Sequence, residues 1–412
     1  MMEQNIGVLI VGGGPAGLAA AVRLWKGGNH DILIVEREAQ LGGILRQCIH
    51  DGFGVTRFGT ALSGPEYAQR FIDEVVELGI PYVTGSTVIH VTDDKTVTVV
   101  SREGLKTYHA RAVIFTMGCR ERTRGALGIP GERPCGVFTA GVAQSYINMH
   151  NLMMGHDVII LGSGDIGMIM ARRLTLEGAK VHGVFEVMPY ASGLPRNVRQ
   201  CLDDYGIPLY LSHTVTDIQG SPRLQSVTIS EVGPDRKPIP GTEKVYPCDT
   251  LILSVGLIPE NELSRGAGVE LDPRTKGAVV DENLQTSIPG TFAAGNVLHV
   301  HDLVDYVSME GEKLADSVSR YLAEGSLPAC PIETKPGSGV GYVMPQRVSG
   351  TEEVTLSMRV RSPMKDCTIV VRQGDTVLAK KKMRKALPAE MIHLKVPASA
   401  VPAQENWEVT AE

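Results

Sequence analysis

The sequence predicts an α/β fold with two Rossmann-like dinucleotide-binding domains, the second inserted in the first, and a small all-β domain at the C-terminus. Three observations carry this prediction. The pattern G-x-G-x-x-G occurs twice, each time after a short apolar strand and at the start of a helical stretch. A meander of short strands follows each copy, and apolar and polar residues alternate again near the end of the chain.

The first copy lies at the start of the chain, where residues 8–11 form an apolar strand and the pattern reads GGGPAG. The first glycine permits a tight turn, the second lets the backbone approach a pyrophosphate, and the third allows helix and strand to pack closely. A second strand, residues 32–35, ends at an acid that can bind ribose hydroxyls. The residues predicted to bind this dinucleotide are Gly12, Gly14, Pro15, Ala16, Gly17 and Glu36.

The second copy repeats this arrangement with the pattern GSGDIG after strand 158–161 and an acid after strand 181–185. A carboxylate at this place binds the 2′-hydroxyl of NAD and repels the 2′-phosphate of NADP, although Arg196 and Arg199 leave NADP open. Two such units in one chain indicate that electrons move between two dinucleotides. The residues predicted to bind NAD(H) are Gly162, Gly164, Asp165, Ile166, Gly167 and Glu186.

The segments after each copy set the expected domain boundaries. Meander strands are expected at residues 87–91, 96–100 and 105–110 and again at 209–215, 224–231 and 243–246, followed by strands 112–116 and 250–255. The run TFAAGN and a helix over about residues 303–322 then complete the first domain. We therefore expect the first dinucleotide-binding domain over residues 1–119 and 250–328 and the second, NAD(H)-binding domain over residues 120–249.

The end of the chain has a different composition. Residues 329–341 are rich in Pro, Gly and Ser and are predicted to be a linker. Alternating stretches in residues 342–412 predict a β-rich domain, in the form of a small sandwich. The basic run at residues 380–385 is most simply a solvated hairpin, and the alternative is a docking surface for an acidic partner.

Length and composition limit the class of protein. The chain has 412 residues and a net charge of −6, so nothing favours nucleic acid as a partner. The apolar N-terminal run lacks a basic flank and contains the first glycine pattern, so we expect neither a signal peptide nor a membrane span. The seven cysteines are scattered without a C-x-x-C pair, which argues against a disulfide framework or a metal cluster and favours a reduced, cytoplasmic location.

The order of these motifs resembles the flavoprotein family of thioredoxin reductase and glutathione reductase, over about residues 5–325. The resemblance implies FAD at the first glycine pattern and NAD(P)H at the second. Where the family usually has an acid that bonds the ribityl chain of FAD, this chain has an asparagine, which can accept the same bond. The resemblance further assigns to FAD the residues Arg37, Gly42, Gly43, Val88, Thr116, Gly118, Gly295, Asn296 and Val307, and to NAD the residue Gly256.

The chain departs from that family at its redox-active disulfide. The cysteine pair would fall at Leu45 and His50, or at Ala140 and Ala143 in the nucleotide domain, and neither place has two cysteines. The string LGGILRQCIHDGFG looks closer to the FAD/NAD subunit found beside bacterial glycerol-3-phosphate dehydrogenases, and to relatives in opine oxidase and dye-linked proline dehydrogenase complexes. That resemblance implies a second flavoprotein or redox subunit as the partner.

Several single residues near these motifs are candidates for chemistry. Cys48 could be a redox thiol and His50 a proton donor to the flavin, and the alternatives are a packed apolar residue and a structural histidine. Because a group of four residues after the closing motif straddles a loop and a helix start, contacts to the flavin or a helix cap explain it better than a metal, and no metal site is predicted. This group consists of His299, His301, Asp302 and Asp305.

The sequence therefore predicts an FAD-dependent NAD(H) oxidoreductase that exchanges electrons with a partner redox subunit. Hydride transfer would depend on proximity and orientation of the two cofactors. Two alternatives remain open. One is a self-contained FAD-dependent dehydrogenase of an amino acid, an opine or a polyol phosphate, and the other is a non-catalytic nucleotide-binding scaffold.

Overall fold

The computed structural model describes residues 2–398 and 405–412. The chain divides into two compact units, of which the first comprises residues 1–119 and 259–412 and the second residues 120–258. The second unit is therefore inserted in the first, and the predicted α/β fold class is confirmed.

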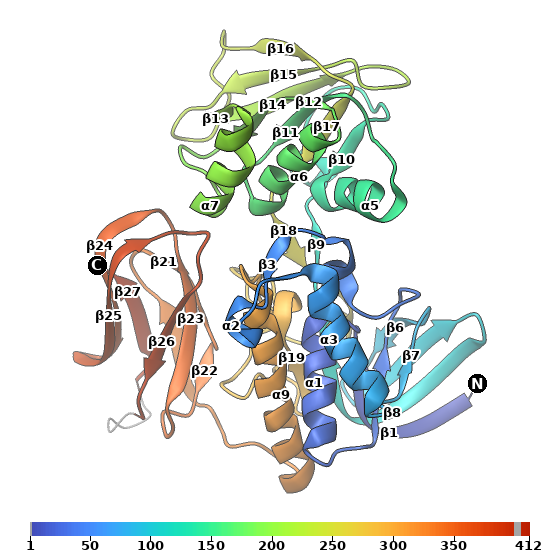
Figure 1. Ribbon diagram of the computed structural model, residues 1–412. Helices are drawn as coiled ribbons and strands as arrows, with labels where there is room; N and C mark the ends of the chain where they lie inside the picture. Colours follow the sequence, from blue (N-terminus) through green and yellow to red (C-terminus); the bar gives the residue numbers. More distant parts are fainter. Residues whose placement is uncertain (1, 399–404) are drawn as a thin grey trace. The chain divides into compact units, whose positions relative to one another are not determined.

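The first unit is built on a sheet with the strand order β5-β2-β1-β8-β7-β6, in which β19 also pairs with β8 (Figure 1). The strands β5, β2, β1, β8 and β19 are parallel, whereas β7 and β6 form the predicted antiparallel meander. The bounds are β1 (Met2–Val11), β2 (Ile32–Val35), β5 (Tyr82–Val83), β6 (Thr87–Val91), β7 (Thr96–Ser101), β8 (Gly104–Phe115) and β19 (Thr291–Ala293).

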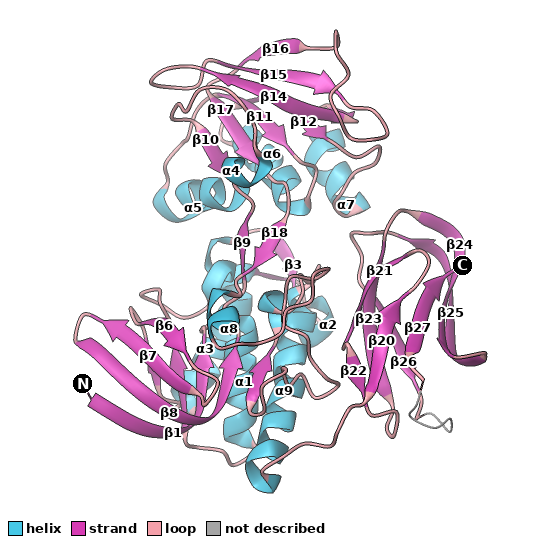
Figure 2. Ribbon diagram, turned by 180° about the vertical axis from the view of Figure 1, so that it is seen from behind, coloured by secondary structure: helices cyan, strands magenta, loops and turns pink. Residues whose placement is uncertain are grey.

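The strand β8 corrects one expectation, because the segments 105–110 and 112–116 form a single strand that pairs with β1 along most of its length. Helices α1, α3 and α9 lie side by side in this unit (Figures 1 and 2). The helical segments are η1 (Gly43–Gln47), α1 (Pro15–Lys26), α2 (Val55–Phe58), α3 (Gly64–Glu77), α8 (Glu262–Gly266), η4 (Gly295–Val297) and α9 (Val304–Glu324), and the small strands are β3 (Asp51–Phe53) and β4 (Leu62–Ser63).

The core of this unit explains why β1 has an unbroken apolar sequence. Val8, Leu9 and Ile10 are all fully buried, as expected for a parallel strand that is covered on both faces. Helix α9 approaches α1 closely at Gly311, where a Cβ would collide with the backbone of Ala16. The fold thus brings a helix from late in the chain against the first glycine pattern.

The second unit has a five-stranded parallel sheet with the order β10-β17-β11-β12-β13 and a separate antiparallel meander, β14-β15-β16. The strands are β10 (Val137–Thr139), β11 (Asp157–Leu161), β12 (Lys180–Glu186), β13 (Leu209–Leu211), β14 (His213–Gln219), β15 (Ser226–Glu231), β16 (Lys244–Pro247) and β17 (Thr250–Leu253). The helical segments are α4 (Arg124–Leu127), α5 (Ala140–His150), α6 (Asp165–Leu176), α7 (Pro195–Asn197), η2 (Val198–Leu202) and η3 (Asp203–Tyr205).

The predicted boundary between residues 249 and 250 is wrong. Strand β17 pairs with β10 and β11, so the chain completes the second sheet before it returns to the first unit after residue 258. The connecting segments β9 (Cys119–Glu121) and β18 (Leu257–Pro259) pair with each other as a two-stranded sheet. Periodicity could not decide this boundary, because a buried strand has the same sequence character in either domain.

The end of the chain forms the predicted β-rich sandwich, with one sheet of order β22-β20-β27-β24-β25 and another of order β21-β23-β26. Its core contains Trp407, which is fully buried. The strands are β20 (Ile332–Pro336), β21 (Val340–Met344), β22 (Arg347–Val348), β23 (Val354–Val360), β24 (Met364–Gln373), β25 (Thr376–Ala386), β26 (Ile392–Val396) and β27 (Trp407–Ala411).

The predicted linker over residues 329–341 is also wrong, since β20 and the start of β21 lie within it. Its glycines form the turn between these strands, where Gly339 has a φ of +75°. The basic run lies on β25, the edge strand of its sheet, where exposed lysines discourage edge-to-edge association. In the part of the chain that the structure describes, no helix combines the length and hydropathy needed to cross a membrane.

Candidate functional site

The first glycine loop joins β1 to α1, and the three glycines of the G-x-G-x-x-G pattern differ in their steric surroundings. Gly12 has a φ of +105°, and a Cβ there would lie 2.7 Å from the carbonyl oxygen of Thr116. A Cβ on Gly17 would collide with the carbonyl oxygen of Gly12, whereas a Cβ on Gly14 would meet no atom within 4 Å. Gly12 and Gly17 therefore permit the turn and the packing, and Gly14 keeps space open at the start of the helix.

The start of α1 has the features of an anion-binding site. Gly14 is the N-cap, Pro15 opens the helix, and no side chain caps the first turn. The first turn also contains no acidic residue. Free N–H groups and the positive end of the helix dipole together favour a phosphate, so this end of α1 fits the pyrophosphate of FAD.

Glu36 is buried at the end of β2 and organises the loop. Its Oε2 accepts a hydrogen bond from the N–H of Gly13 at 2.7 Å, and its Oε1 accepts one from the N–H of Glu38 at 2.8 Å. The side chain of the neighbouring Arg37 is exposed. Glu36 therefore fixes the glycine loop, and its contact with a ribose stays a prediction.

Thr116 and Gly118 lie where β8 ends beside the loop. The Oγ1 of Thr116 donates to the carbonyl oxygen of Val11 at 2.9 Å, which ties this strand end to the glycine turn. Gly118 has a φ of +73°, and a Cβ there would face open space. Val88, in contrast, is buried in the core on β6.

The pair Gly42-Gly43 packs against the same loop. The N–H of Gly42 donates to the carbonyl oxygen of Gly13 at 2.8 Å, and a Cβ on Gly43 would lie 3.1 Å from the Cα of Gly14. Both glycines have positive φ angles. They thus allow a second backbone segment to approach the predicted phosphate position.

The closing motif comes next to the loop because β19 pairs with β8. A Cβ on Gly295 would lie 3.0 Å from the Cβ of Ala16 and 3.2 Å from Val307. The structure thereby brings together three residues that the sequence assigned to FAD from distant segments. The Oδ1 of Asn296 accepts a hydrogen bond from the N–H of His301 at 3.0 Å and so positions the loop before α9.

The second glycine loop reproduces the hydrogen bonds of the first. The Oε2 of Glu186 accepts from the N–H of Ser163 at 3.0 Å, and its Oε1 accepts from the N–H of Met188 at 2.9 Å. In both loops the acid and its glycine-loop partner are 23 residues apart. The internal duplication therefore extends to individual hydrogen bonds.

The start of α6 resembles the start of α1. Gly164 is the N-cap without a side-chain cap, and Gly162 has a φ of +99°. A Cβ on Gly167 would lie 2.7 Å from the Cβ of Ser254. Asp165 differs from its counterpart in α1, because its Oδ1 accepts a hydrogen bond from the N–H of Leu194 at 2.8 Å and holds that segment.

The surroundings of Glu186 bear on the choice of nucleotide. Its Oε2 also accepts hydrogen bonds from the hydroxyls of Ser163 at 2.6 Å and Ser192 at 2.7 Å, so the acid is held in place. Of the other residues predicted to contact NAD, Ile166 is half-buried in the first turn of α6. Gly256 has a φ of +103° and faces open space.

Cys48 and His50, the two candidates for redox and proton-transfer chemistry, lie at the end of η1 and two residues beyond it. The Cys48 thiol is buried, its Sγ donates to the carbonyl oxygen of Ile44 at 3.4 Å, and burial raises its pKa to about 12. Such a thiol is protonated at neutral pH and matches the packed alternative. The ring of His50 is half-buried, with its centroid 5.0 Å from that of Phe53.

The positions of the missing disulfide are occupied by packed residues. Leu45 is buried in η1, and Ala140 and Ala143 are fully buried in α5. None of the seven cysteines, which all lie within the described ranges, is joined in a disulfide. The structure therefore contains no disulfide that could relay electrons between a flavin and an acceptor.

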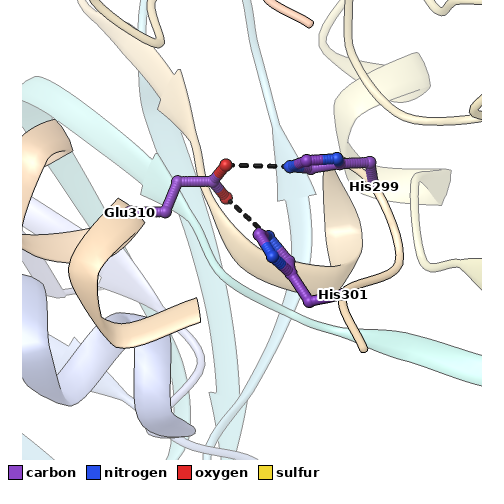
Figure 3. Close-up of side chains that lie close together, drawn as sticks. All are labelled: His299, His301 and Glu310. Atoms are coloured by element: carbon purple, nitrogen blue, oxygen red, sulfur yellow. Dashed lines mark hydrogen bonds and ion pairs between the residues drawn. The ribbon is translucent and has the colours of Figure 1, made fainter. Parts of the chain in front are cut away.

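Two histidines after the closing motif meet a glutamate from α9 (Figure 3). The Nε2 of His299 is 2.9 Å from Oε1 of Glu310, and the Nε2 of His301 is 3.2 Å from its Oε2. Burial, and then His301, lowers the pKa of His299. Burial alone would raise the pKa of Glu310, but the two histidines outweigh it and keep this pKa below its usual value.

Sequence reasoning found the histidines but missed Glu310, which is separated from them by more than a helical turn. Asp302 and Asp305, which were grouped with the histidines, have other partners. Asp302 lies 3.5 Å from the guanidinium of Arg359, and Asp305 accepts a hydrogen bond from the N–H of Thr56 at 3.2 Å. The sequence placed Glu310 only on the helix that follows the histidines, and its position on that helix does not by itself show that it faces them.

Comparisons with known proteins agree with this geometry. Residues 7–314 match the family of pyridine nucleotide-disulphide oxidoreductases. The chain is 27% identical over 299 residues to a thioredoxin reductase of Listeria innocua, in a match that covers 72% of this chain and 86% of the relative.

Two further similarities extend this comparison. Subunit HcnB of the hydrogen cyanide synthase of Pseudomonas protegens is 25% identical over 409 residues, which covers 92% of this chain and 82% of that protein. The crystal structure of T. acidophilum thioredoxin reductase superposes with a TM-score of 0.63 and 26% identity over 77% of this chain and 98% of that one.

Proposed function

Since the chain belongs to the family of pyridine nucleotide-disulphide oxidoreductases, we propose that it passes electrons between NAD(H), FAD and a partner redox subunit of a dehydrogenase complex. FAD and NAD(P)H are the cofactors of this family. The proposal rests on one combination of features. Both glycine loops are complete, yet neither family position of the redox-active disulfide has two cysteines, and the described cysteines form no disulfide.

The residues of this chain would contribute placement rather than acid–base chemistry. Bound FAD supplies the ability to accept a hydride and to release its electrons to an acceptor. The uncapped N-termini of α1 and α6 would hold the two pyrophosphates, and Glu36 and Glu186 keep the glycine loops in shape. Preorganisation of this kind contributes by orienting the reacting groups.

The similarity to subunit HcnB, which covers 92% of this chain, supports a partner subunit. The name of that relative describes a subunit of hydrogen cyanide synthase, whereas the name of the Listeria relative describes a reductase of thioredoxin. Because the disulfide positions are filled by Leu45, Ala140 and Ala143, electrons leaving the flavin need another acceptor. A second redox protein is the acceptor that we propose.

The first test is anaerobic mixing of the FAD-loaded protein with NADH and with NADPH, followed through the flavin absorbance. We expect NADH to bleach the flavin faster than NADPH, because the buried carboxylate of Glu186 repels a 2′-phosphate. A flavin that stays oxidised with both nucleotides contradicts the proposal and supports a scaffold.

The second test compares acceptors after reduction by NADH. We expect rapid reduction of an artificial dye and negligible reduction of a small disulfide such as oxidised glutathione. Disulfide reduction at a rate similar to that of the dye would overturn the proposed route. Bleaching by a small organic substrate in the absence of NADH would instead support a self-contained dehydrogenase.

A further inference from the structure

We propose that His299, His301 and Glu310 form a binding site for one divalent transition-metal ion. The two histidines belong to the loop between η4 and α9, and the glutamate lies in the second turn of α9 (Figure 3). One ligand atom from each of the three residues lies within 4.8 Å of the others. The two histidine side chains are only 1% and 3% exposed and the glutamate side chain 13%, so the cluster is shielded from water.

The types and spacing of these atoms suit such an ion. Two imidazole nitrogens with one carboxylate are ligands for zinc and for ferrous iron, and the absence of a thiolate in the set disfavours softer ions. Tetrahedral bonds of zinc to nitrogen and oxygen place neighbouring ligand atoms about 3.3 Å apart. The observed separations of 2.9 Å and 3.2 Å join the two histidines to different oxygens of Glu310, and the three ligand atoms lie within 4.8 Å of one another, so the side chains would shift to reach that geometry.

The charges around the cluster leave a place for a cation. Among the described residues, both ion pairs of Glu310 are to histidines, and no lysine or arginine lies within ion-pair distance of it. The nearby Asp302 and Arg359 face each other at 3.5 Å and so largely offset one another. A divalent ion would therefore take the place of the protons through which the two histidines pair with Glu310.

Surrounding contacts hold the ligands in position, as outer contacts do in metal sites. The Nδ1 of His299 is 3.5 Å from the hydroxyl of Tyr342, on β21 of the sandwich. The N–H of Gly295 donates to Oε2 of Glu310 at 2.6 Å and orients the carboxylate. The Nδ1 of His301 is buried without a hydrogen-bond partner. Only the ring of His299 therefore has the outer contact that metal-bound histidines usually make.

This site is distinct from the two glycine loops, and the cluster does not depend on the function proposed above. Three protein ligands leave one coordination position for water or another small ligand. The loop that carries both histidines is anchored through Asn296 of the closing motif. Binding of a metal would therefore stiffen the segment that follows the predicted ribityl contact.

Metal analysis of the full-length, FAD-loaded protein tests the proposal. The protein is stripped with a chelator, offered Zn²⁺, Co²⁺ or Fe²⁺ one at a time, passed through a desalting column and analysed by mass spectrometry. We expect one ion per chain and a higher thermal midpoint with the ion that binds. If the wild-type protein retains none of the three ions, the proposal is overturned, and the three side chains share only protons.

Variants locate the ion. We expect His301→Gln and Glu310→Gln to bind the ion at least about tenfold more weakly, and Tyr342→Phe to weaken it by about tenfold through the loss of an outer contact. The matched control is His182→Gln, which removes a histidine that lies 2.9 Å from Asp157 in the second unit and leaves metal content unchanged.

Flavin content and the circular dichroism spectrum report whether each variant folds. If a ligand variant does not fold, the Co²⁺ form of the wild-type protein decides. Absorption bands of imidazole-bound Co²⁺ at wavelengths beyond the flavin bands support the site, and bands of the aqueous ion overturn it. Unchanged metal content in folded His301→Gln would also overturn it.

Discussion

At the scale of single residues, two buried acids perform the same task in the two halves of the chain. Glu36 and Glu186 each accept the N–H of the second residue of a glycine loop and the N–H two residues beyond themselves. A buried N–H that loses its acceptor costs about 1–3 kcal/mol. Each acid should therefore matter to the shape of its own loop.

We predict that the two acids can be separated by function. Glu36→Ala should lower FAD affinity about tenfold to a hundredfold, and Glu186→Ala should weaken NADH binding similarly while FAD stays bound, because each change leaves one loop amide unsatisfied. Flavin content and rapid-mixing titration with NADH measure the two effects. Glu38→Ala, at an exposed neighbour, is the control and should change neither. Equal effects of both variants on FAD would contradict the assignment.

Cys48 gives a second prediction at this scale. Burial raises its pKa to about 12, so only about one thiol in ten thousand is ionised at pH 8. Iodoacetamide should therefore modify the exposed Cys135 well before Cys48, as peptide mass mapping can follow. In the Cys48→Ala variant, NADH should still reduce the flavin. If the variant loses this reaction, Cys48 is a redox group after all.

At the scale of elements, the helix starts and their glycines decide cofactor binding. Gly17 lies where α1 touches the preceding turn, whereas Gly14 borders open space at the N-terminus of the same helix. In the sequence, both glycines belong to the same G-x-G-x-x-G pattern and cannot be told apart by role. The structure separates a glycine needed for packing from one that leaves room for a phosphate.

We predict opposite results for alanine at these two glycines. Gly17→Ala should lower the thermal midpoint of the apoprotein, because the new Cβ collides with the carbonyl oxygen of Gly12 and α1 must shift. Gly14→Ala should leave that midpoint nearly unchanged and weaken FAD binding, since its Cβ enters the space for the pyrophosphate. Differential scanning calorimetry and flavin titration distinguish the two. A normal FAD affinity for Gly14→Ala would place the pyrophosphate elsewhere.

At the scale of the whole molecule, the sandwich belongs to the first unit and contacts the loop between η4 and α9. Arg359 of β23 donates to the carbonyl oxygens of Val300 at 3.0 Å and Pro388 at 2.9 Å, and it also faces Asp302. Only 17% of the arginine side chain and 12% of the aspartate side chain are exposed. This contact therefore couples the end of the chain to the segment beside the closing motif.

We predict that Arg359→Ala destabilises the first unit by roughly 2 kcal/mol, because Asp302 and the carbonyl groups of Val300, Pro388 and Ala389 lose a mostly buried partner. Urea denaturation of the flavin-loaded protein measures this change. Lys395→Ala, which breaks the exposed pair between Lys395 and Glu353, is the control and should have little effect. A similar loss in both variants would mean that the contact contributes no more than a surface pair.

The sequence predicted the glycine loops, their acids and the closing motif well, because each has a short pattern set by local backbone geometry. It was wrong about the boundary at residue 250 and the linker at 329–341. The sequence of a buried strand such as β17 does not show which sheet the strand joins. The glycines before Val340 form a turn between strands of two different sheets, which composition cannot distinguish from a linker. Glu310 was missed for a related reason, since its partners lie on a different element.

The sequence by itself determined that this chain has two dinucleotide loops, no cysteine pair at the two family positions and a β-rich end, since these follow from residue types and short spacings. Only the tertiary structure decided which strands complete each sheet. It also showed that Gly295 meets Ala16 and that His299 and His301 converge on Glu310. Such contacts depend on how distant segments pack, and packing is set by the shape of the whole core rather than by any local pattern.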